Sequence, residues 1–128
     1  MMSQRILVIE DHEDNRQILR DLFTSVDFEV IEAADGETGL AAAAAHRPDL
    51  ILIDIQLPDI DGYEAARRLK ADTLLHAIPI IAVTSYALAG EADTARAAGC
   101  DAYIPKPYSP RQLLAKVRQY LTSPAPTR

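Results

Sequence analysis

Five short aliphatic runs, spaced regularly along the chain, constrain the fold more than any other sequence feature. Each run has the length of a β-strand and is rich in branched residues, and its apolar positions are largely continuous rather than alternating. Continuous apolar strands are typical of parallel sheets that are covered by helices on both faces. The runs span residues 5–9, 28–33, 50–53, 78–83 and 102–104. They predict a parallel sheet of five strands between two layers of helices.

The segment after the first run and the segment after the last run both have the periodicity of amphipathic helices. One apolar stripe, expected to face the core, is formed by Ile18, Leu19, Leu22, Phe23 and Val26. A second stripe is formed by Leu113, Leu114, Val117, Tyr120 and Leu121. Ser109, Pro110 and Gln112 precede the second stripe with the N-cap, first-turn proline and capping-box glutamine of a helix start.

Capping residues delimit three further helices. Asp35 and Asp61 are suited to cap helices that reach about residues 46 and 70, and Gly99 is suited to end a helix over about residues 88–98. The chain is therefore predicted to be βα repeated five times. This order favours a single α/β domain with a doubly wound parallel sheet and right-handed crossovers.

Composition narrows the classes of partner. The chain of 128 residues has 13 Lys and Arg against 19 Asp and Glu, and its formal net charge of −6 gives no attraction for nucleic-acid phosphates or anionic lipid. No apolar run approaches the roughly 18 residues that a membrane helix needs.

Cys100, the single cysteine, is expected as a small buried hydrophobe in a reducing cytosol. We expect a cytoplasmic protein with a domain over residues 1–122 and a flexible tail over residues 123–128.

Polar side chains follow the carboxyl ends of four predicted strands, where the active sites of doubly wound sheets lie. They are Glu10, Asp11, Asp54, Thr84, Ser85 and Lys106. Carboxylates about 4 Å apart repel each other by roughly 4 kcal/mol at an effective dielectric constant of 20, so three in one pocket require a raised pKa, a cation or both. Oxygen ligands without histidine or cysteine favour Mg²⁺. The set therefore predicts a magnesium site.

A metal beside a lysine, a hydroxyl and a central carboxylate suits phosphoryl transfer to an aspartate. Asp54, on the central strand, is the expected acceptor. Glu10 and Asp11 are expected to be metal ligands, directly or through water. The turn that follows Asp54 is suited to direct the backbone carbonyl of Gln56 at the same metal. Lys106, between two prolines that stiffen its loop, is expected to contact the phosphoryl group.

Four motifs resemble those of the receiver domains of two-component response regulators, in the family's order and spacing over about residues 4–122. They are Ile9-Glu10-Asp11, the segment from Asp54 to Gly62, Val83-Thr84-Ser85, and Tyr103-Ile104-Pro105-Lys106-Pro107. The resemblance implies a (βα)5 flavodoxin-like fold and a cis peptide bond between Lys106 and Pro107. The chain is most similar to stand-alone receivers of the cell-division and phosphorelay kind.

The resemblance also implies a role for each matching residue. The phosphoacceptor would be Asp54, assisted by Thr84 and Lys106. The Mg²⁺ site would be formed by Glu10, Asp11, Asp54 and the backbone carbonyl of Gln56. The switch pair would be Thr84 and Tyr103. In the resembling family, the positions of Gln56 and Tyr86 flank the path of the attacking water. Both residues are neutral and bulky here, so we expect them to control dephosphorylation and to make hydrolysis slow.

These roles imply a signalling switch rather than an enzyme with turnover. A sensor histidine kinase or a histidine phosphotransfer protein would be the donor, and a downstream protein would bind the face formed by the fourth helix, the fifth strand and the fifth helix. The helix over residues 88–98 offers mainly alanine to the core, so we expect it to be loosely packed and to change on phosphorylation. We expect a monomer or weak dimer, with no direct contact to nucleic acid or membrane.

Two other functions stay open from the sequence. A Mg²⁺-dependent phosphohydrolase would also use Asp54 as nucleophile, but Gln56 stands where such enzymes have a second aspartate. An interaction module that retains only the fold would not need Asp54, Thr84 and Lys106, which are all present. The histidines are expected on the surface, without a catalytic role; they are His12, His46 and His76.

Overall fold

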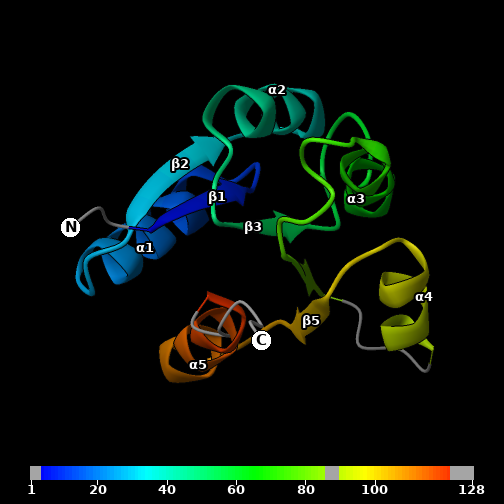
Figure 1. Cartoon of the computed structure of the whole chain (residues 1–128). Helices are drawn as coiled ribbons and strands as arrows, with labels where there is room; N and C mark the ends of the chain where they lie inside the picture. Colours follow the sequence, from blue (N-terminus) through cyan, green and yellow to red (C-terminus); the bar gives the residue numbers. More distant parts are fainter. Residues whose placement is uncertain (1–3, 86–89, 122–128) are drawn as a thin grey trace, which may run out of the picture.

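The computed structural model describes residues 4–85 and 90–121 of the chain, in which strands and helices alternate (Figure 1). The strands are β1 (Arg5–Ile9), β2 (Glu29–Ala33), β3 (Leu50–Asp54), β4 (Ile80–Thr84) and β5 (Ala102–Pro105). The helices are α1 (Glu13–Thr24), α2 (Gly36–His46), α3 (Gly62–Ala71), α4 (Glu91–Ala97) and α5 (Pro110–Leu121). The predicted (βα)5 order is confirmed.

The strands form one parallel sheet in the order β2-β1-β3-β4-β5. The order reverses between β1 and β3, because the chain first moves from β1 to one edge of the sheet and then crosses to the other side. Ligands of doubly wound sheets bind at the carboxyl ends of the strands beside such a reversal. The acidic residues Glu10, Asp11 and Asp54 stand at the ends of β1 and β3, as predicted.

Helices cover both faces of the sheet, so alternate strand residues enter different cores. Residues such as Ile9 and Ile53 pack with α2, α3 and α4, and residues such as Val8 and Leu52 pack with α1 and α5. Figure 1 shows α1 and α5 on one side of the strands and α2, α3 and α4 on the other. The central strand β3 is buried over its whole length, which explains its continuous apolar sequence.

The first helix differs from its prediction in which residues face the core. Leu19 and Phe23 are buried, but Ile18 is 61% exposed and Val26 lies beyond the end of the helix. Ile18 is one residue, or about 100° of helical rotation, from Leu19, which places it outside the face that α1 turns to the sheet. The expected stripe was therefore too wide, and Ile18 is an apolar residue on the surface.

Among the element boundaries that differ from the prediction, the starts of β4 and of the fourth helix shift for local reasons. β4 begins at Ile80 rather than 78, because the Ile78 N–H closes a turn on the Leu75 carbonyl and Pro79 has no N–H. The described part of the fourth helix begins at Glu91, after Gly90 in the left-handed region, and the expected positions 88 and 89 lie outside the described residues. Gly99, with φ of 99°, follows the helix end as predicted.

Other predictions concern single positions. The Lys106–Pro107 peptide bond is cis, as the resemblance implied. Cys100 is buried, and burial raises the pKa of its thiol to about 11. Among the helices of residues 4–85 and 90–121, none has the length and apolar character that crossing a membrane requires. The proposed tail over residues 123–128 lies outside the described residues, so the domain limits stay a prediction.

Candidate functional site

The polar residues predicted at the strand ends come together at one edge of the sheet. Asp54 is the last residue of β3 and is 5% exposed, and Glu10 directly follows β1 and is 4% exposed. Thr84 ends β4 and is buried, and its carbonyl accepts a hydrogen bond from the Lys106 N–H at 2.7 Å. The parallel register thus brings residues from four strands to one site.

Lys106 joins the end of β5 to the two buried carboxylates. Its Nζ lies 3.1 Å from Oδ2 of Asp54 and 3.5 Å from Oε1 of Glu10. Burial acts to lower the pKa of Lys106, but the charges of Asp54 and Glu10 outweigh burial and raise it. The side chain is therefore held as an ammonium that partly compensates the negative charge of the site.

The two buried carboxyls have pKa values that move apart. For Asp54, burial and the neighbouring Glu10 raise the pKa. For Glu10, burial also acts to raise the pKa, but hydrogen bonds with Asp54 and with the backbone N–H of His12 help to outweigh it, and the pKa is lowered. A proton taken up by the pair is therefore held first on Asp54, and Glu10 keeps the negative charge.

Asp11 provides the test of whether a cation fits this site. Its Oδ1 atom is buried and accepts no hydrogen bond from residues 4–85 or 90–121, although the His12 Nδ1 atom lies 3.1 Å away. A buried carboxylate oxygen without a hydrogen bond, in a cluster with the buried Glu10 carboxylate, is unfavourable unless a cation contacts it. The donors are oxygens of the kind that Mg²⁺ binds, and the residues present therefore fit such an ion.

His12 is exposed, as expected, yet it also belongs to this acidic cluster. Its side chain is 70% exposed, and its Nδ1 atom lies 3.1 Å from Oε2 of Glu10 and 3.1 Å from Oδ1 of Asp11. His12 occupies the N-cap position of α1 without making a side-chain capping bond. The imidazole instead turns back towards the carboxylates of Glu10 and Asp11, so it lies at the edge of the site.

The loop between β3 and α3 is held close to Asp54. The Gln56 N–H donates to Oδ1 of Asp54 at 2.9 Å, and the Gly62 N–H donates to the Ile55 carbonyl at 2.8 Å. A Cβ atom at Gly62 would lie 2.6 Å from the backbone oxygen of Asp54. Glycine is therefore required for the close return of the chain. The role of the Gln56 carbonyl as a metal ligand stays a prediction.

Asp59 fixes the same loop to a neighbouring helix. Its two carboxylate oxygens accept hydrogen bonds from the backbone N–H groups of Gly36 and Glu37, both at 2.8 Å. These groups lie in the first turn of α2, where backbone donors have no partner within the helix. The N–H of Glu37 is the main cause that lowers the pKa of Asp59. The loop after Asp54 is thus held by hydrogen bonds near Asp54 and, through Asp59, by hydrogen bonds to α2.

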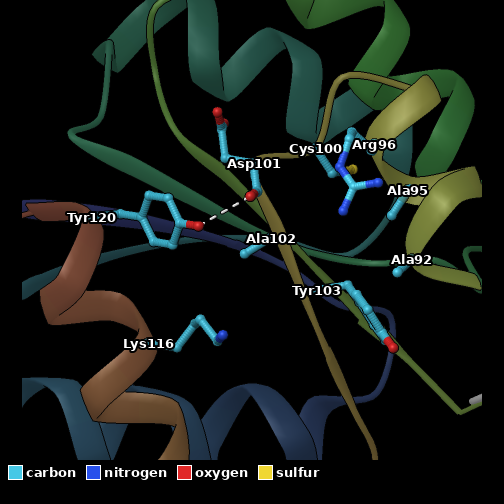
Figure 2. Close-up of a pocket in the computed structure, with 9 residues that line it drawn as sticks. All are labelled: Ala92, Ala95, Arg96, Cys100, Asp101, Ala102, Tyr103, Lys116 and Tyr120. Atoms are coloured by element: carbon cyan, nitrogen blue, oxygen red, sulfur yellow. Dashed lines mark hydrogen bonds between the residues drawn. The ribbon is translucent and has the colours of Figure 1, made fainter.

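The proposed switch aromatic lies away from the acidic cluster. Tyr103, on β5, is partly buried and lines a cavity of about 230 Å³ between α4, β5 and α5 (Figure 2). Lys116 and Tyr120 of α5 line the same cavity. Tyr86, expected to control dephosphorylation, lies outside the described residues.

Two residues at the site were missed by the sequence analysis. Tyr108, beside the cis bond, is partly buried and, together with Glu10 and Asp54, lines a small cavity beneath the site. Arg16 of α1 donates to the backbone carbonyl of Glu10 at 2.8 Å. A basic residue one turn into the helix that follows the acidic pair was the available signal for Arg16.

The chain is similar to known signalling proteins over nearly its whole length. It is 42% identical over 120 residues to the polar-differentiation response regulator DivK of Brucella anthropi, covering 94% of this chain and 98% of that protein. A solved neighbour is the receiver domain of sensor histidine kinase PA1611 from Pseudomonas aeruginosa PAO1, with a magnesium ion coordinated in its active site cleft. Its TM-score is 0.87 at 33% identity, covering 95% of this chain and all of that one.

A second solved neighbour is the chemotaxis response regulator CheY4 of Vibrio cholerae, with a TM-score of 0.89 at 26% identity, covering 94% of this chain and 100% of that one. These relatives support a role in two-component signal transduction and do not favour the phosphohydrolase alternative. Residues 6–118 match the family model described as the response regulator receiver domain. The family resemblance found in the sequence is therefore confirmed, and the chain belongs to the response regulator receiver domain family.

Proposed function

We propose that Asp54 accepts a phosphoryl group from a phosphohistidine donor and that Mg²⁺ is held by Glu10, Asp11, Asp54 and the backbone carbonyl of Gln56. The observation that carries this proposal is the buried Asp54 carboxylate, which lies 3.1 Å from the Lys106 ammonium beside a second buried acid. The buried Oδ1 of Asp11, which accepts no hydrogen bond from the described residues, supports the metal. The Mg²⁺ ion coordinated in the active site cleft of the related PA1611 receiver domain is consistent with it.

The proposed step is a displacement at phosphorus. An oxygen of the ionised Asp54 carboxylate forms the new P–O bond, the P–N bond to the donor imidazole breaks, and the imidazole keeps the electron pair. Lys106 would contact a phosphoryl oxygen, and its contact with Asp54 favours the ionised carboxylate. Mg²⁺, when bound, supplies further neutralisation of the phosphoryl charge.

The output of the switch is proposed to be protein contact. The Thr84 hydroxyl, at the end of β4, would bind the phosphoryl group, and Tyr103 would move with it. Tyr103 lies on the face formed by α4, β5 and α5, which we propose as the binding surface for a downstream protein. The protein is thus proposed to act as a phosphoacceptor switch and to take part in its own dephosphorylation, without turnover of a separate substrate.

The donor is proposed to dock beside Ile18. This exposed side chain lines a hollow of about 460 Å³ together with Pro107 and Tyr108, and Lys106 of the acceptor site lines the same hollow. A sensor histidine kinase or histidine phosphotransfer protein that covers Ile18 would bring its phosphohistidine next to Lys106. Substituting Ile18 with Glu is therefore expected to slow transfer from such a protein and to leave transfer from a small acyl phosphate unchanged.

The test of the proposed function is phosphorylation by a small acyl phosphate in Mg²⁺ buffer, followed by intact-protein mass spectrometry. One phosphoryl adduct that is absent in Asp54→Asn is the expected result. Continuous hydrolysis of the acyl phosphate without limit would instead indicate the phosphohydrolase. No adduct in the wild-type protein would indicate an interaction module.

The metal site has a separate test. Asp11→Ala is expected to abolish saturable Mg²⁺ binding in calorimetric titration, because it removes one of the carboxylates proposed to hold the ion. A titration that matches wild type would place the metal elsewhere. Cytoplasmic location, monomer or weak dimer state and the absence of direct nucleic-acid contact stay predictions from the sequence.

A further inference from the structure

We propose that Arg16 is a positioning residue for the magnesium site, acting through the backbone of Glu10; this inference rests on the proposed function. The Nη1 atom of Arg16 donates to the main-chain oxygen of Glu10 at 2.8 Å. Glu10 and Asp11 are the two carboxylates that β1 delivers to the site. Arg16 therefore contacts the peptide group that joins them.

The Arg16 side chain is well placed for a fixed role. It is only 15% exposed, and its Nη2 atom donates to Oε1 of Glu13 at 2.5 Å. Its Nε atom lies 3.4 Å from Oε1 of Glu32 on β2. One planar guanidinium thus contacts oxygens from the end of β1, the first turn of α1 and the strand β2. These contacts hold the guanidinium at the start of the loop that carries the acidic pair.

The hydrogen bond from Arg16 to the Glu10 carbonyl fixes the orientation of the backbone at Asp11, the next residue. The Glu10 N–H already donates to the Ala33 carbonyl at 3.0 Å, so Arg16 completes the fixation of Glu10 on its carbonyl side. The orientation of this carbonyl and that of the Asp11 N–H belong to one planar peptide group. Fixing that group sets the position from which the Asp11 side chain enters the site. Without it, mutual repulsion of the carboxylates is free to turn the loop outward.

Arg20 provides a matched control one turn further along α1. It makes the same kinds of ion pair, with Oε2 of Glu13 at 3.5 Å and Oε2 of Glu32 at 2.5 Å. Within the part of the chain that the structure describes, the hydrogen bonds and ion pairs of Arg20 include none to Glu10. The two arginines therefore share their acidic partners and differ in the contact with the acidic loop.

The experiment compares Mg²⁺ binding by isothermal titration calorimetry for wild type, Arg16→Met, Arg16→Lys and Arg20→Met, with thermal unfolding of each variant in metal-free buffer. Residues that orient metal ligands typically change metal affinity by about 10- to 100-fold when replaced. We expect Arg16→Met to weaken Mg²⁺ binding by about this factor, Arg16→Lys to restore part of the loss through one remaining donor, and Arg20→Met to stay within about twofold of wild type.

Each other outcome contradicts the inference. Wild-type affinity in Arg16→Met, or an equal loss in Arg20→Met, would show that Arg16 contributes only to helix stability. Failure of both Arg16 variants to fold would assign it a purely structural role. If wild type itself binds no Mg²⁺, the proposed metal site fails and the positioning role fails with it. If wild type binds Mg²⁺ normally, failure of the Arg16 prediction leaves the proposed function intact.

Discussion

Asp54 combines a buried position with a requirement to be ionised, and this conflict has a measurable effect on stability. Burial and the neighbouring Glu10 raise its pKa in the folded state, so the folded protein binds a proton there more readily than the unfolded chain does. The loss of stability is therefore largest above the raised pKa, shrinks as the pH falls below it, and is gone below the pKa of the unfolded chain. The Lys106 ammonium reduces the conflict without removing it.

We predict that Asp54→Asn is more stable than wild type in metal-free buffer at pH 7, by on the order of 1 kcal/mol. Lys106 keeps Glu10 as a partner in this variant, at 3.5 Å in the present structure. The advantage should shrink as the pH is lowered and the wild-type carboxyl becomes neutral, and it should also shrink in excess Mg²⁺. Thermal unfolding at a series of pH values measures it, with Asp93→Asn on the exposed surface of α4 as a control that changes little.

A lower stability of Asp54→Asn at pH 7 without metal, or an advantage that grows as pH falls, would contradict this account of the carboxyl cluster. The Asp54→Ala variant offers a second measurement. It removes the carboxyl entirely and should also exceed wild type in metal-free buffer, unless the small cavity that it leaves costs more than the charge did.

A second prediction concerns how long the phosphoryl group on Asp54 lasts. Gln56 and the sequence position Tyr86 present no carboxylate to orient an attacking water, so we expect a lifetime of minutes or longer without a phosphatase. Tyr86→Ala should shorten it by admitting water. Decay of the phosphorylated protein in Mg²⁺ buffer measures both. Decay of wild type within seconds, or equal rates in the two proteins, would place control of water access elsewhere.

The geometry of a parallel sheet explains why some site residues could be predicted from the sequence and others could not. Glu10, Asp54 and Lys106 follow or end strands, and parallel strand ends must meet at one edge. Arg16 could not be placed in this way, because its long side chain reaches back over the end of β1 from the surface of a helix. Nor does sequence spacing indicate which of two buried carboxyls takes up the proton first, since that depends on individual hydrogen bonds.

The β3–α3 loop is the element whose shape most directly affects the site. It begins at the acceptor, and it is closed by the Gly62 N–H and anchored on α2 by Asp59. The atoms nearest to a Cβ at Gly62 are backbone atoms, which cannot give way as the end of a flexible side chain can. The loop therefore has little freedom to adjust to a larger residue at this position.

We predict that Gly62→Ala destabilises the protein by about 1–3 kcal/mol and weakens Mg²⁺ binding, because a Cβ would lie 2.6 Å from the Asp54 oxygen and 2.7 Å from the Ile55 Cα. Gly90→Ala is the comparison. Among the described residues, a Cβ there has nothing within 4 Å, but φ is 88°, so the substitution should cost roughly 1 kcal/mol through backbone strain and leave Mg²⁺ binding unchanged. Equal effects of the two variants on Mg²⁺ affinity would contradict the role of the loop.

The sequence predicted the identity and order of the elements better than their faces and ends. Continuous apolar runs suffice to find buried strands, because every position of such a strand must be apolar. The face of α1 was predicted less well, since Ile18 is apolar but lies on the exposed side of the helix. An apolar surface residue cannot be told from a core residue by periodicity when both stand next to each other in the stripe.

The helices differ in the size of the side chains that they bury against the sheet, and we expect this difference to decide which parts of the molecule change on phosphorylation. Within residues 91–97, Ala95 is the buried residue of α4, whereas α1 buries Leu19 and Phe23 and α5 buries Leu113 and Val117. A small side chain forms fewer dispersion contacts than a large one. α4 also borders the cavity that Tyr103 lines (Figure 2).

We predict that phosphorylation, or a phosphoryl mimic, changes amide hydrogen exchange most strongly over residues 91–108 and in α5. The helix α2, which packs on β1 and β2, is the internal control and should change least. Unchanged exchange in α4 and β5 on phosphorylation would contradict a switch through this face. A change spread evenly over all five helices would indicate a general gain in stability rather than a local rearrangement.

The contact between Lys106 and Asp54 spans 52 positions of the chain, and this separation has a consequence for protein synthesis. A ribosome delivers Asp54 and the acidic pair well before it delivers β5 and its lysine. A nascent chain that ends before β5 therefore carries the acceptor without the ammonium that would contact the phosphoryl group. We therefore expect competence to receive a signal to depend on completion of the fold, and copies truncated before β5 to accept no phosphoryl group.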